Sequence, residues 1–362
     1  MRTMNSWWGR LMMKRLCRLV WLLPLTAVLL FTLVSLAPID PVQAYVGARM
    51  SMIGPEQQAA IEAAWGLDQP GWIRFFHWLA HLVQGDLGDS ISYNAPVLTV
   101  LVERFPASLA LMGCSFLAAF VVGSGLGVLA AACQGRWPDR LIRGWAMVIS
   151  VSPGFWIALL FISIFAVQLA WLPSCCALPP GVTQDEAHWW QYGRHLVLPV
   201  LTLSIYGTGP LILHVRQRLI GFLDGPSARH LRLHGMSSTR LALGPGSRHA
   251  LGSAVTVHLA SIGELFGGSV LAETIFAWPG LGQATVKAAT GADAPLLLGI
   301  ALVTVVVVLL GNLLADILAA WVDPRLRIMP QEETLPRLKR LPWLKASARL
   351  KTASRLKVEP KS

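Results

Sequence analysis

The sequence has little charge. Only 14% of its 362 residues are Asp, Glu, Lys or Arg, and 54% are hydrophobic, whereas a typical soluble domain carries about 25% charged residues. Four stretches contain no charged residue at all, and they lie at 19–39, 105–135, 144–184 and 294–315. Each can form a helix that crosses a ~30 Å hydrocarbon core, which takes about 20 residues. The scarcity of charge excludes a soluble protein and predicts an all-α, polytopic membrane protein.

The sequence also lacks the motifs of two enzyme classes. It contains no G-x-x-x-x-G-K-[ST] loop, with which ATPases hold phosphate groups. It contains no H-E-x-x-H motif for an intramembrane metalloprotease. Its Ser and His residues show no spacing that indicates a catalytic triad. We therefore predict no catalytic residue and no enzyme activity, so that any energy source must reside in other chains.

Cysteine is scarce, with five residues. Cys17, Cys114 and Cys133 fall in or beside predicted helices, where a thiol serves as small apolar filler. Cys175 and Cys176 are adjacent in a segment predicted to lie outside the membrane, and a single pair without a second pair is a weak metal signature. We predict no metal site in this chain.

The charge that is present is mainly positive, with 30 Lys and Arg against 19 Asp and Glu. Five basic residues precede the first apolar stretch, eleven follow Pro324, and most of the others fall in two loops between apolar stretches. This is the positive-inside pattern of membrane proteins and not a nucleic-acid groove. We predict that both termini are cytoplasmic and that nucleic acid is not a partner.

Six spans fit this charge pattern, at about residues 19–37, 107–132, 148–169, 196–213, 254–274 and 295–319. The first span is interpreted as a retained signal anchor, because no clear cleavage site follows it. The predicted order is a basic cytoplasmic N-terminus, the first helix, an extracytoplasmic segment, a five-helix core and a basic cytoplasmic tail, at 1–18, 19–37, 38–106, 107–321 and 322–362. The tail either lies on the anionic inner leaflet or is solvated, and both alternatives stay open.

The longest and most cationic internal loop lies at 215–252, between the fourth and fifth spans. Pro226 is suited to a first helical turn, Gly235 to a turn after it, and Ser237 to the cap of a second helix. The loop is therefore predicted to form two short helices on the membrane surface that dock into a groove on a soluble partner. His230 and His234 have the i, i+4 spacing of zinc ligands, but no third ligand is evident, which favours partner contact.

Six motifs carry a resemblance to a known family, and they occur in the order LAPIDPV, GLDQPGWIRFFHWLAHLVQGDLGDSISYNAPV, SVSPGFWIALLFISIFAVQLAWLP, HLVLPVLTLS, ELFGGSVLAETIFAWPGLGQ and VDPRLR. Over about residues 15–327 the chain resembles the dipeptide/oligopeptide/nickel permease family, the membrane subunits of binding-protein-dependent ABC importers. In AWPGLG, Pro279 ends a helix, and Gly280 and Gly282 permit a re-entrant turn.

The resemblance implies a type I ABC importer permease in the bacterial inner membrane. It implies no cofactor in this chain, with ATP and Mg bound by a partner ATPase. The implied partners are a second permease subunit that is usually a paralogue, two ATP-binding subunits, an extracytoplasmic substrate-binding protein and membrane lipid.

The resemblance also identifies the 215–252 loop as the coupling loop that contacts the ATPase. The residues expected to make this contact are Arg229, His230, Arg232, His234, Gly235, Arg248 and His249. The loop departs from the family pattern at Leu231 and Leu233, where small residues are usual, and at Val257, where Pro is usual. Four extra residues, GPGS at 244–247, are expected to interrupt the second helix.

Glu264 lies inside the fifth predicted span, where a carboxylate is costly and a functional role is the default expectation. A hydrogen-bonded packing role is the alternative. The residues expected along the translocation path are Glu264, Gly267, Gly268, Glu273, Trp278, Pro279 and Gly280. The wording of the motifs leans toward nickel or a metal chelate as cargo, with di- or oligopeptides as the alternative. A secondary transporter or a channel that ATP does not drive is a remoter one.

Overall fold

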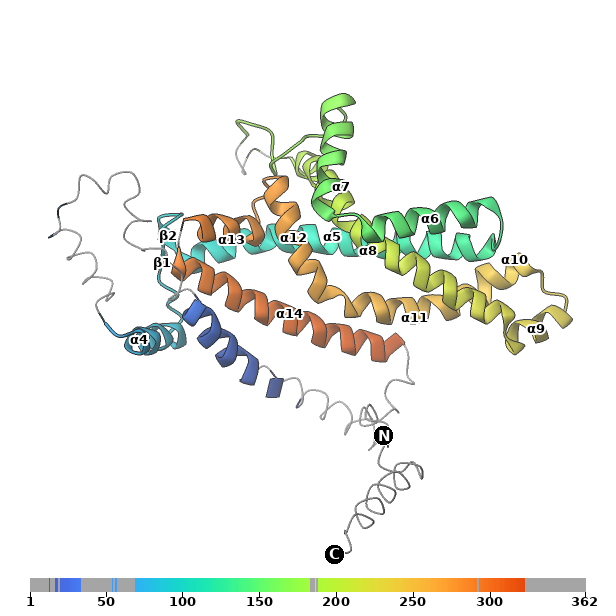
Figure 1. The fold of residues 1–362 in the computed structure, drawn as a ribbon, viewed down its shortest axis with the longest axis horizontal. Coiled ribbons are helices and arrows are strands. Elements are labelled where there is room, and N and C mark those ends of the chain that lie inside the picture. The colour runs from blue at the N-terminus through green and yellow to red at the C-terminus, as the bar shows by residue number, and fades with distance from the viewer. Residues whose placement is uncertain are drawn as a thin grey trace, which may run out of the picture. The chain divides into compact units, whose positions relative to one another are not determined.

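Figure 1 shows the computed structural model of the chain. It describes residues 20–33, 69–182, 188–291 and 293–322, with isolated positions at 13, 17, 18, 54, 56 and 186. The chain divides into two units, Met1–Val322 and Asp323–Ser362, and the second has no described residue. The predicted tail beyond residue 322, the VDPRLR arginines and most of the segment before residue 69 therefore lie outside the described residues.

Helices make up nearly all of the described elements, because in lipid a helix satisfies its own backbone hydrogen bonds. A two-stranded antiparallel hairpin, β1–β2, is the exception. In chain order the elements are the helix Val20–Leu33, α4 (Gly71–Val83), β1 (Asp89–Ser90), β2 (Ala95–Pro96), α5 (Val97–Ala132), α6 (Trp137–Val151), α7 (Gly154–Phe161), the π-helix η2 (Ile162–Gln168), α8 (Trp189–Asp224), α9 (Pro226–Leu233), α10 (Ser238–Leu241), the π-helix η3 (Ala242–Gly246), α11 (Ser247–Ala260), α12 (Ile262–Ile275), α13 (Leu281–Thr290) and α14 (Ala294–Val322).

Helix α8 is central to the packing, since it contacts α5, α6, α7, α11 and α12. Its neighbour α5 is equally long, at 36 residues, and the two helices lie side by side (Figure 1). Gly123 and Gly127 of α5 allow this close approach. A Cβ atom on Gly127 would lie 2.7 Å from the Cβ of Val215, and one on Gly123 would lie 3.0 Å from Cδ2 of Leu211. The pair forms a G-x-x-x-G motif, with which small residues bring membrane helices together.

Three helices are long and apolar enough to cross a membrane, namely α5, α8 and most of α14. Two bent pairs, α6 with α7–η2 and the α10–α11 rod with α12, meet the same criteria when each pair is taken together. The first predicted span is described only as the shorter apolar helix Val20–Leu33. These elements occur at all six predicted positions, but the number six itself stays a prediction.

Two predicted spans are broken. The third, at 148–169, was expected as one helix and this is wrong, because α6 ends at Val151 and the chain bends by 111° before α7–η2. Pro153 has no N–H for the helix ladder, and Ser152 before it is extended, with ψ at 135°. The fifth predicted span, at 254–274, is broken at Ser261, between α11 and α12, with a bend of 59°.

The GPGS segment at 244–247 does not interrupt its helix, so that prediction is wrong. Residues 238–260 form one continuous helical rod, in which η3 occupies Ala242–Gly246. A π-helical turn accommodates an inserted residue without ending the helix, and Pro245 lies within this turn. Gly246 faces α8 so closely that a Cβ atom would lie 2.6 Å from Cδ1 of Leu219. The segment is therefore a continuous π-turn packed on α8.

Buried Asp293 fastens the hairpin to the start of α14. Its carboxylate accepts hydrogen bonds from the hydroxyl of Ser90 at 2.6 Å, the N–H of Ser92 at 2.9 Å and the N–H of Leu296 at 3.2 Å. A fully buried carboxylate requires such partners. The contact joins two segments about 200 residues apart in the sequence, and so fixes the end of the core that is predicted to lie outside.

Asp86, in the GDLGDS motif, caps a turn. Its carboxylate accepts a hydrogen bond from the N–H of Gly88 at 2.9 Å and lies 3.1 Å from Nδ1 of His81. The Gly88 hydrogen bond, and then the His81 contact, lower the pKa of Asp86 below its usual value. The side chain is exposed, so its role is local.

Gly127→Ala tests the α5–α8 contact, with Gly125→Ala as its matched control. The added methyl group at 127 would overlap Val215, whereas at Gly125 it would meet no heavy atom within 4 Å. Overpacking costs about 1–3 kcal/mol. We therefore expect Gly127→Ala to lower the thermal unfolding midpoint of the purified protein in detergent, and Gly125→Ala not to lower it. Equal midpoints would contradict the packing.

Candidate functional site

The predicted cytoplasmic loop at 215–252 is folded throughout. Helix α8 extends into it as far as Asp224, and α9 begins with Pro226 in its first turn. Gly235, with φ at +81°, forms the turn to α10, where the Ser237 hydroxyl accepts a hydrogen bond from the N–H of Arg240 at 3.4 Å. The first short helix, the glycine turn and the Ser237 cap are those that the sequence predicts. The second helix is not short, because α10 continues through η3 into α11 as the rod of residues 238–260. We call residues 226–251 the coupling platform.

The outward face of the coupling platform is cationic. All seven residues predicted to contact the ATPase are exposed, and they are Arg229, His230, Arg232, His234, Gly235, Arg248 and His249. Arg240 is also exposed. Leu233 stands among these groups with 85% of its surface exposed. Leu243 of the same segment is 62% exposed. The platform thus presents positive charge together with two exposed leucines.

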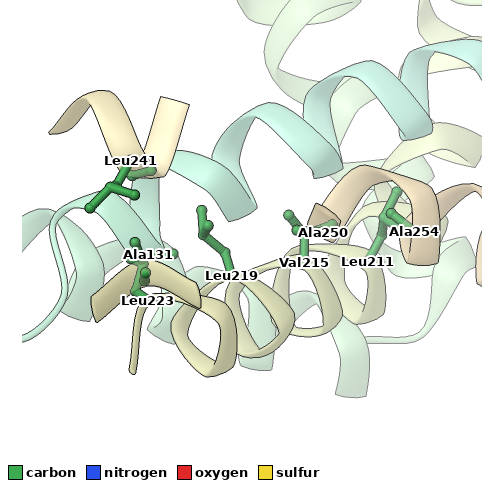
Figure 2. Packing of buried hydrophobic residues seen from close by; sticks show 10 residues of the cluster. Ala131, Leu211, Val215, Leu219, Leu223, Leu241, Ala250 and Ala254 are labelled. Atoms are coloured by element: carbon green, nitrogen blue, oxygen red, sulfur yellow. The ribbon is translucent and has the colours of Figure 1, made fainter. Parts of the chain in front are cut away.

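The underside of the coupling platform is apolar and rests on α8. Figure 2 shows Leu241 of α10 and Ala250 and Ala254 of α11 in a buried cluster with α8 and with Ala131 of α5. Helix α8 contributes side chains four residues apart, which form one stripe along its surface, and they are Leu211, Val215, Leu219 and Leu223. Burying one leucine away from water contributes about 1.5–3 kcal/mol. The stripe holds the platform on the end of α8.

A buried ion pair holds α8 to α6. The guanidinium of Arg216 donates to both oxygens of Asp139, from Nε at 2.6 Å and from Nη2 at 2.8 Å. Asp139 is 2% exposed, and the N–H of Gly135 also donates to it at 2.9 Å. Two-point pairs of this kind fix orientation as well as distance. Two residues earlier in α8, Nε2 of His214 lies 2.9 Å from the Ser253 hydroxyl of α11. Helices α6, α8 and α11 are therefore linked at this level of α8, before the chain enters the platform.

A hollow of about 490 Å³ opens on the face formed by α7, α8 and α12. Three predicted path residues line it, namely Glu264, Gly267 and Gly268. Its other lining residues are Gly154, Ala158, Thr202, Leu203, Tyr206, Leu271, Ala272 and Ile275. Glu264 is exposed and follows the break at Ser261, in the first turn of α12. A carboxylate there complements the positive end of the helix dipole.

The other carboxylate among the predicted path residues, Glu273, has a different environment. It is fully buried and accepts hydrogen bonds from the Ser108 hydroxyl at 2.8 Å and from the N–H groups of Gly282 at 2.6 Å and Gln283 at 3.3 Å. The Ser108 hydroxyl in turn accepts the N–H of Leu281 at 2.7 Å. Glu273 and Ser108 thus cap the N-terminus of α13 and fix it to α12 and α5.

The AWPGLG segment makes the turn that this arrangement requires. Trp278 is fully buried and donates from Nε1 to the carbonyl oxygen of Ala107 at 2.9 Å. Pro279 follows it between α12 and α13. A Cβ atom on Gly280 would collide with the Glu273 carboxylate and the Ser108 hydroxyl. Glycine is needed at 280 because the carboxylate occupies the space that a side chain would fill.

The residues weighed as metal ligands do not form a larger cluster. Cys175 and Cys176 are joined as a disulfide. The rings of His230 and His234 lie 4.4 Å apart between centroids. Within the described part of the chain, no group of three or more His, Cys, Asp or Glu residues is placed to hold a metal ion.

Sequence reasoning missed several residues of the site. Thr202 and Tyr206 lie in the hollow, Ser108 anchors Glu273, and Asp139 pairs with Arg216. Asp139 and Arg216 are 77 residues apart, and Ser108 and Glu273 are 165 apart. A single sequence has no local signal for such pairs. The four-residue spacing of Thr202 and Tyr206 predicts that they share one helix face. It does not indicate whether this face lines a hollow or packs against another helix.

Comparison with known proteins gives consistent matches over the length of the chain. Residues 9–112 match the family "Binding-prot-dependent transport system membrane comp, N-term", and residues 123–328 match "Binding-protein-dependent transport system inner membrane component". The glutathione transport system permease protein GsiC of Salmonella typhimurium is 34% identical over 319 residues, which cover 87% of this chain and 98% of that protein. A putative peptide permease protein of Brucella ovis is 32% identical over 308 residues, which cover 85% of this chain and 95% of that protein.

A solved structure supports the fold. The inward-facing MetNI methionine ABC transporter has a chain that aligns with a TM-score of 0.50 at 18% identity, covering 62% of this chain and 97% of that chain. At this level of identity the similarity concerns the fold alone. It agrees with the type I importer fold that the resemblance implies.

Fold and site together indicate a membrane transport protein, with helices long and apolar enough to span a membrane, a folded basic loop, a hollow between helices and no ATP-binding motif in the sequence. The chain belongs to the family of inner membrane components of binding-protein-dependent transport systems. It is a permease subunit of an ABC importer in the inner membrane, and ATP is hydrolysed by separate subunits. The family predicted from the motifs is confirmed.

The variants Glu273→Gln and Glu264→Gln compare how much the buried and the exposed carboxylate contribute to the stability of the fold. The change at 273 replaces an ion by a neutral amide opposite two N–H donors, and hydrogen bonds to charged groups contribute about 1.5–3 kcal/mol. We expect a clear fall in the thermal unfolding midpoint for Glu273→Gln. We expect no fall for Glu264→Gln, because no described residue bonds to that carboxylate. Equal stability of the two variants would contradict the assignment of Glu273 to the fold.

Proposed function

We propose that this chain forms part of the inner-membrane path of an importer for short peptides, glutathione among them. The observation that carries the proposal is its similarity, over nearly their whole length, to relatives named as glutathione and peptide permeases. The same comparisons favour the peptide alternative over nickel, toward which the motif wording leaned.

In this proposal the hollow is the share of the path that the chain contributes. Glu264, Gly267 and Gly268 line it, and a Cβ atom on Gly267 would meet nothing within 4 Å. Non-helical backbone and broken helices within a membrane are tolerated where they face protein or a water-filled cavity. The breaks at Ser152–Pro153 and at Ser261 flank the helices that form this face, which supports a path here.

The other predicted path residues have a supporting role in this proposal. Glu273 and Trp278 fix the turn between α12 and α13 through buried hydrogen bonds, and Pro279 and Gly280 lie within this turn. Helix α12 carries both this turn and Glu264. These residues therefore hold the wall of the path in place without contacting cargo.

In this proposal the coupling platform is the part of the chain that contacts the ATP-binding subunit and moves with it. We propose that α9 and α10 dock into a groove of an ATP-binding subunit, where Leu233 enters an apolar pocket and the exposed arginines meet acidic groups. Helix-in-groove docking uses such an apolar anchor with charged residues around it. The platform rests on α8, and Thr202, Leu203 and Tyr206 of α8 line the hollow. A push at the platform thus acts on a wall of the path.

The proposed assembly contains a second permease that is a paralogue, two ATP-binding subunits that bind ATP and Mg, and an extracytoplasmic substrate-binding protein, all in contact with membrane lipid where they enter the bilayer. A secondary transporter or channel is disfavoured, because it would leave the cationic coupling platform without a role.

Uptake by cells that lack their own peptide and nickel importers tests the substrate. We expect cells that produce this chain with its partner subunits to accumulate radiolabelled glutathione or dialanine, and to take up nickel only at the background level. Cells with the partner subunits but without this chain are the control. Nickel accumulation without peptide accumulation would overturn the choice.

A further inference from the structure

The hollow contains a single charge. Among the described lining residues, Glu264 is the only acidic one, and none is Lys, Arg or His. Its carboxylate is exposed and forms no hydrogen bond or ion pair with any described residue. Ionisable residues within membrane-spanning segments usually pair with one another or with a ligand. Glu264 therefore offers a charge that no described side chain pairs with.

A second polar group in the hollow is also without a partner. Thr202 is among the lining residues and is 6% exposed, and its buried hydroxyl forms no hydrogen bond within the described structure. Two other hydroxyls on the same helix behave in the ordinary way, since Ser204 donates to the carbonyl of Leu201 and Thr208 to that of Ile205. Buried polar groups without a partner are rare and call for one. Thr202 thus points independently to a ligand.

The chemistry of the lining indicates what this ligand carries. A carboxylate repels anions, and a hydroxyl oxygen accepts a hydrogen bond. Tyr206, which is 58% exposed, offers an aromatic ring to a cation. Gly267 leaves space beside it, since a Cβ atom there would meet nothing within 4 Å. An ammonium group, with one positive charge and three N–H donors, matches the carboxylate, the hydroxyl and the ring together.

We propose that the hollow holds the ammonium group of the cargo during its passage, with Glu264 as the counter-charge and Thr202 as a hydrogen-bond acceptor. The inference rests on the proposed function, since it assigns to the permease a preference for cargo with a free amino group. It names Glu264 as a specificity-determining residue of the path itself, in addition to any selection by the binding protein.

Charged thiol reagents test the hollow without knowledge of the cargo. In the complete importer reconstituted in proteoliposomes, Leu271→Cys places a thiol at an exposed lining position. The rates of labelling by the cationic 2-aminoethyl and the anionic 2-sulfonatoethyl methanethiosulfonate are then compared, with the importer lacking this change as the background for native cysteines. We expect Glu264→Gln to lower the cation-to-anion rate ratio about tenfold, because a unit charge at close range in a partly dry site has an effect of this order.

Glu103→Gln is the matched control, since Glu103 is an exposed helical carboxylate outside the hollow. We expect it to leave the ratio unchanged. An equal ratio with and without the Glu264 charge would overturn the proposal, and so would the absence of any labelling at the Leu271→Cys position.

Transport separates this inference from the proposed function. With glutathione and dialanine as probes, we expect Glu264→Gln to lower ATP-driven uptake about tenfold, Thr202→Val to lower it as well, and Glu103→Gln to leave it unchanged. If the unaltered importer takes up neither probe, the proposed function fails and the labelling ratio still decides the preference for cations. If it takes up a probe and Glu264→Gln equals Glu103→Gln, the inference fails and the proposed function stands.

Discussion

The close contact of α5 with α8 is the constraint on which the rest of the described structure depends. Gly127 has no room for a side chain, because a Cβ atom there would lie 2.7 Å from that of Val215. Once α8 is held in this way, one stripe of its surface supports the coupling platform (Figure 2). Thr202 and Tyr206, further toward its N-terminus, line the hollow. Helix α8 therefore contacts both the coupling platform and the hollow, so a displacement of the platform acts on a helix that lines the hollow.

Three buried carboxylates hold the elements around this helix pair, and each of the three is matched with partners. Asp139 is paired with Arg216, while Glu273 and Asp293 accept hydrogen bonds from hydroxyl and N–H groups of distant segments. Removing one partner from such a group is costly because the other is left buried and unpaired. Glu264 differs from all of these, since its carboxylate has no partner in the described chain. The absence of a partner, and not the presence of a carboxylate in a span, separates Glu264 from the carboxylates that stabilise the fold. It is the reason for which we propose that Glu264 lines the path.

The sequence predicts the fold class, the positions of the spans and the helices of the coupling platform, because apolar length, Pro, Gly and caps are local signals. It does not predict that the helix ends before Pro153. A proline within a helix can produce a small kink or end the helix, and the local sequence does not indicate which of the two occurs. The π-turn at Gly246 was equally hidden, because it depends on the side chain of Leu219 on another helix. Glu264 and Glu273 have the same apolar setting in the sequence. Only partners far away in the chain, such as Ser108, separate their roles.

We propose that the coupling platform transmits conformational changes of the ATPase to the helices around the hollow. The substitution Leu233→Asp tests this proposal at the contact with the ATPase. Leu233 is 85% exposed, so this change places a charge in the proposed pocket of the partner without disturbing the platform's own packing. Central anchor residues contribute about 2 kcal/mol or more to binding. The account predicts an unchanged thermal unfolding midpoint for the chain, a loss of co-purifying ATP-binding subunit of more than about tenfold, and the loss of ATP-driven peptide uptake. Full co-purification and full uptake by the Leu233→Asp importer would contradict it.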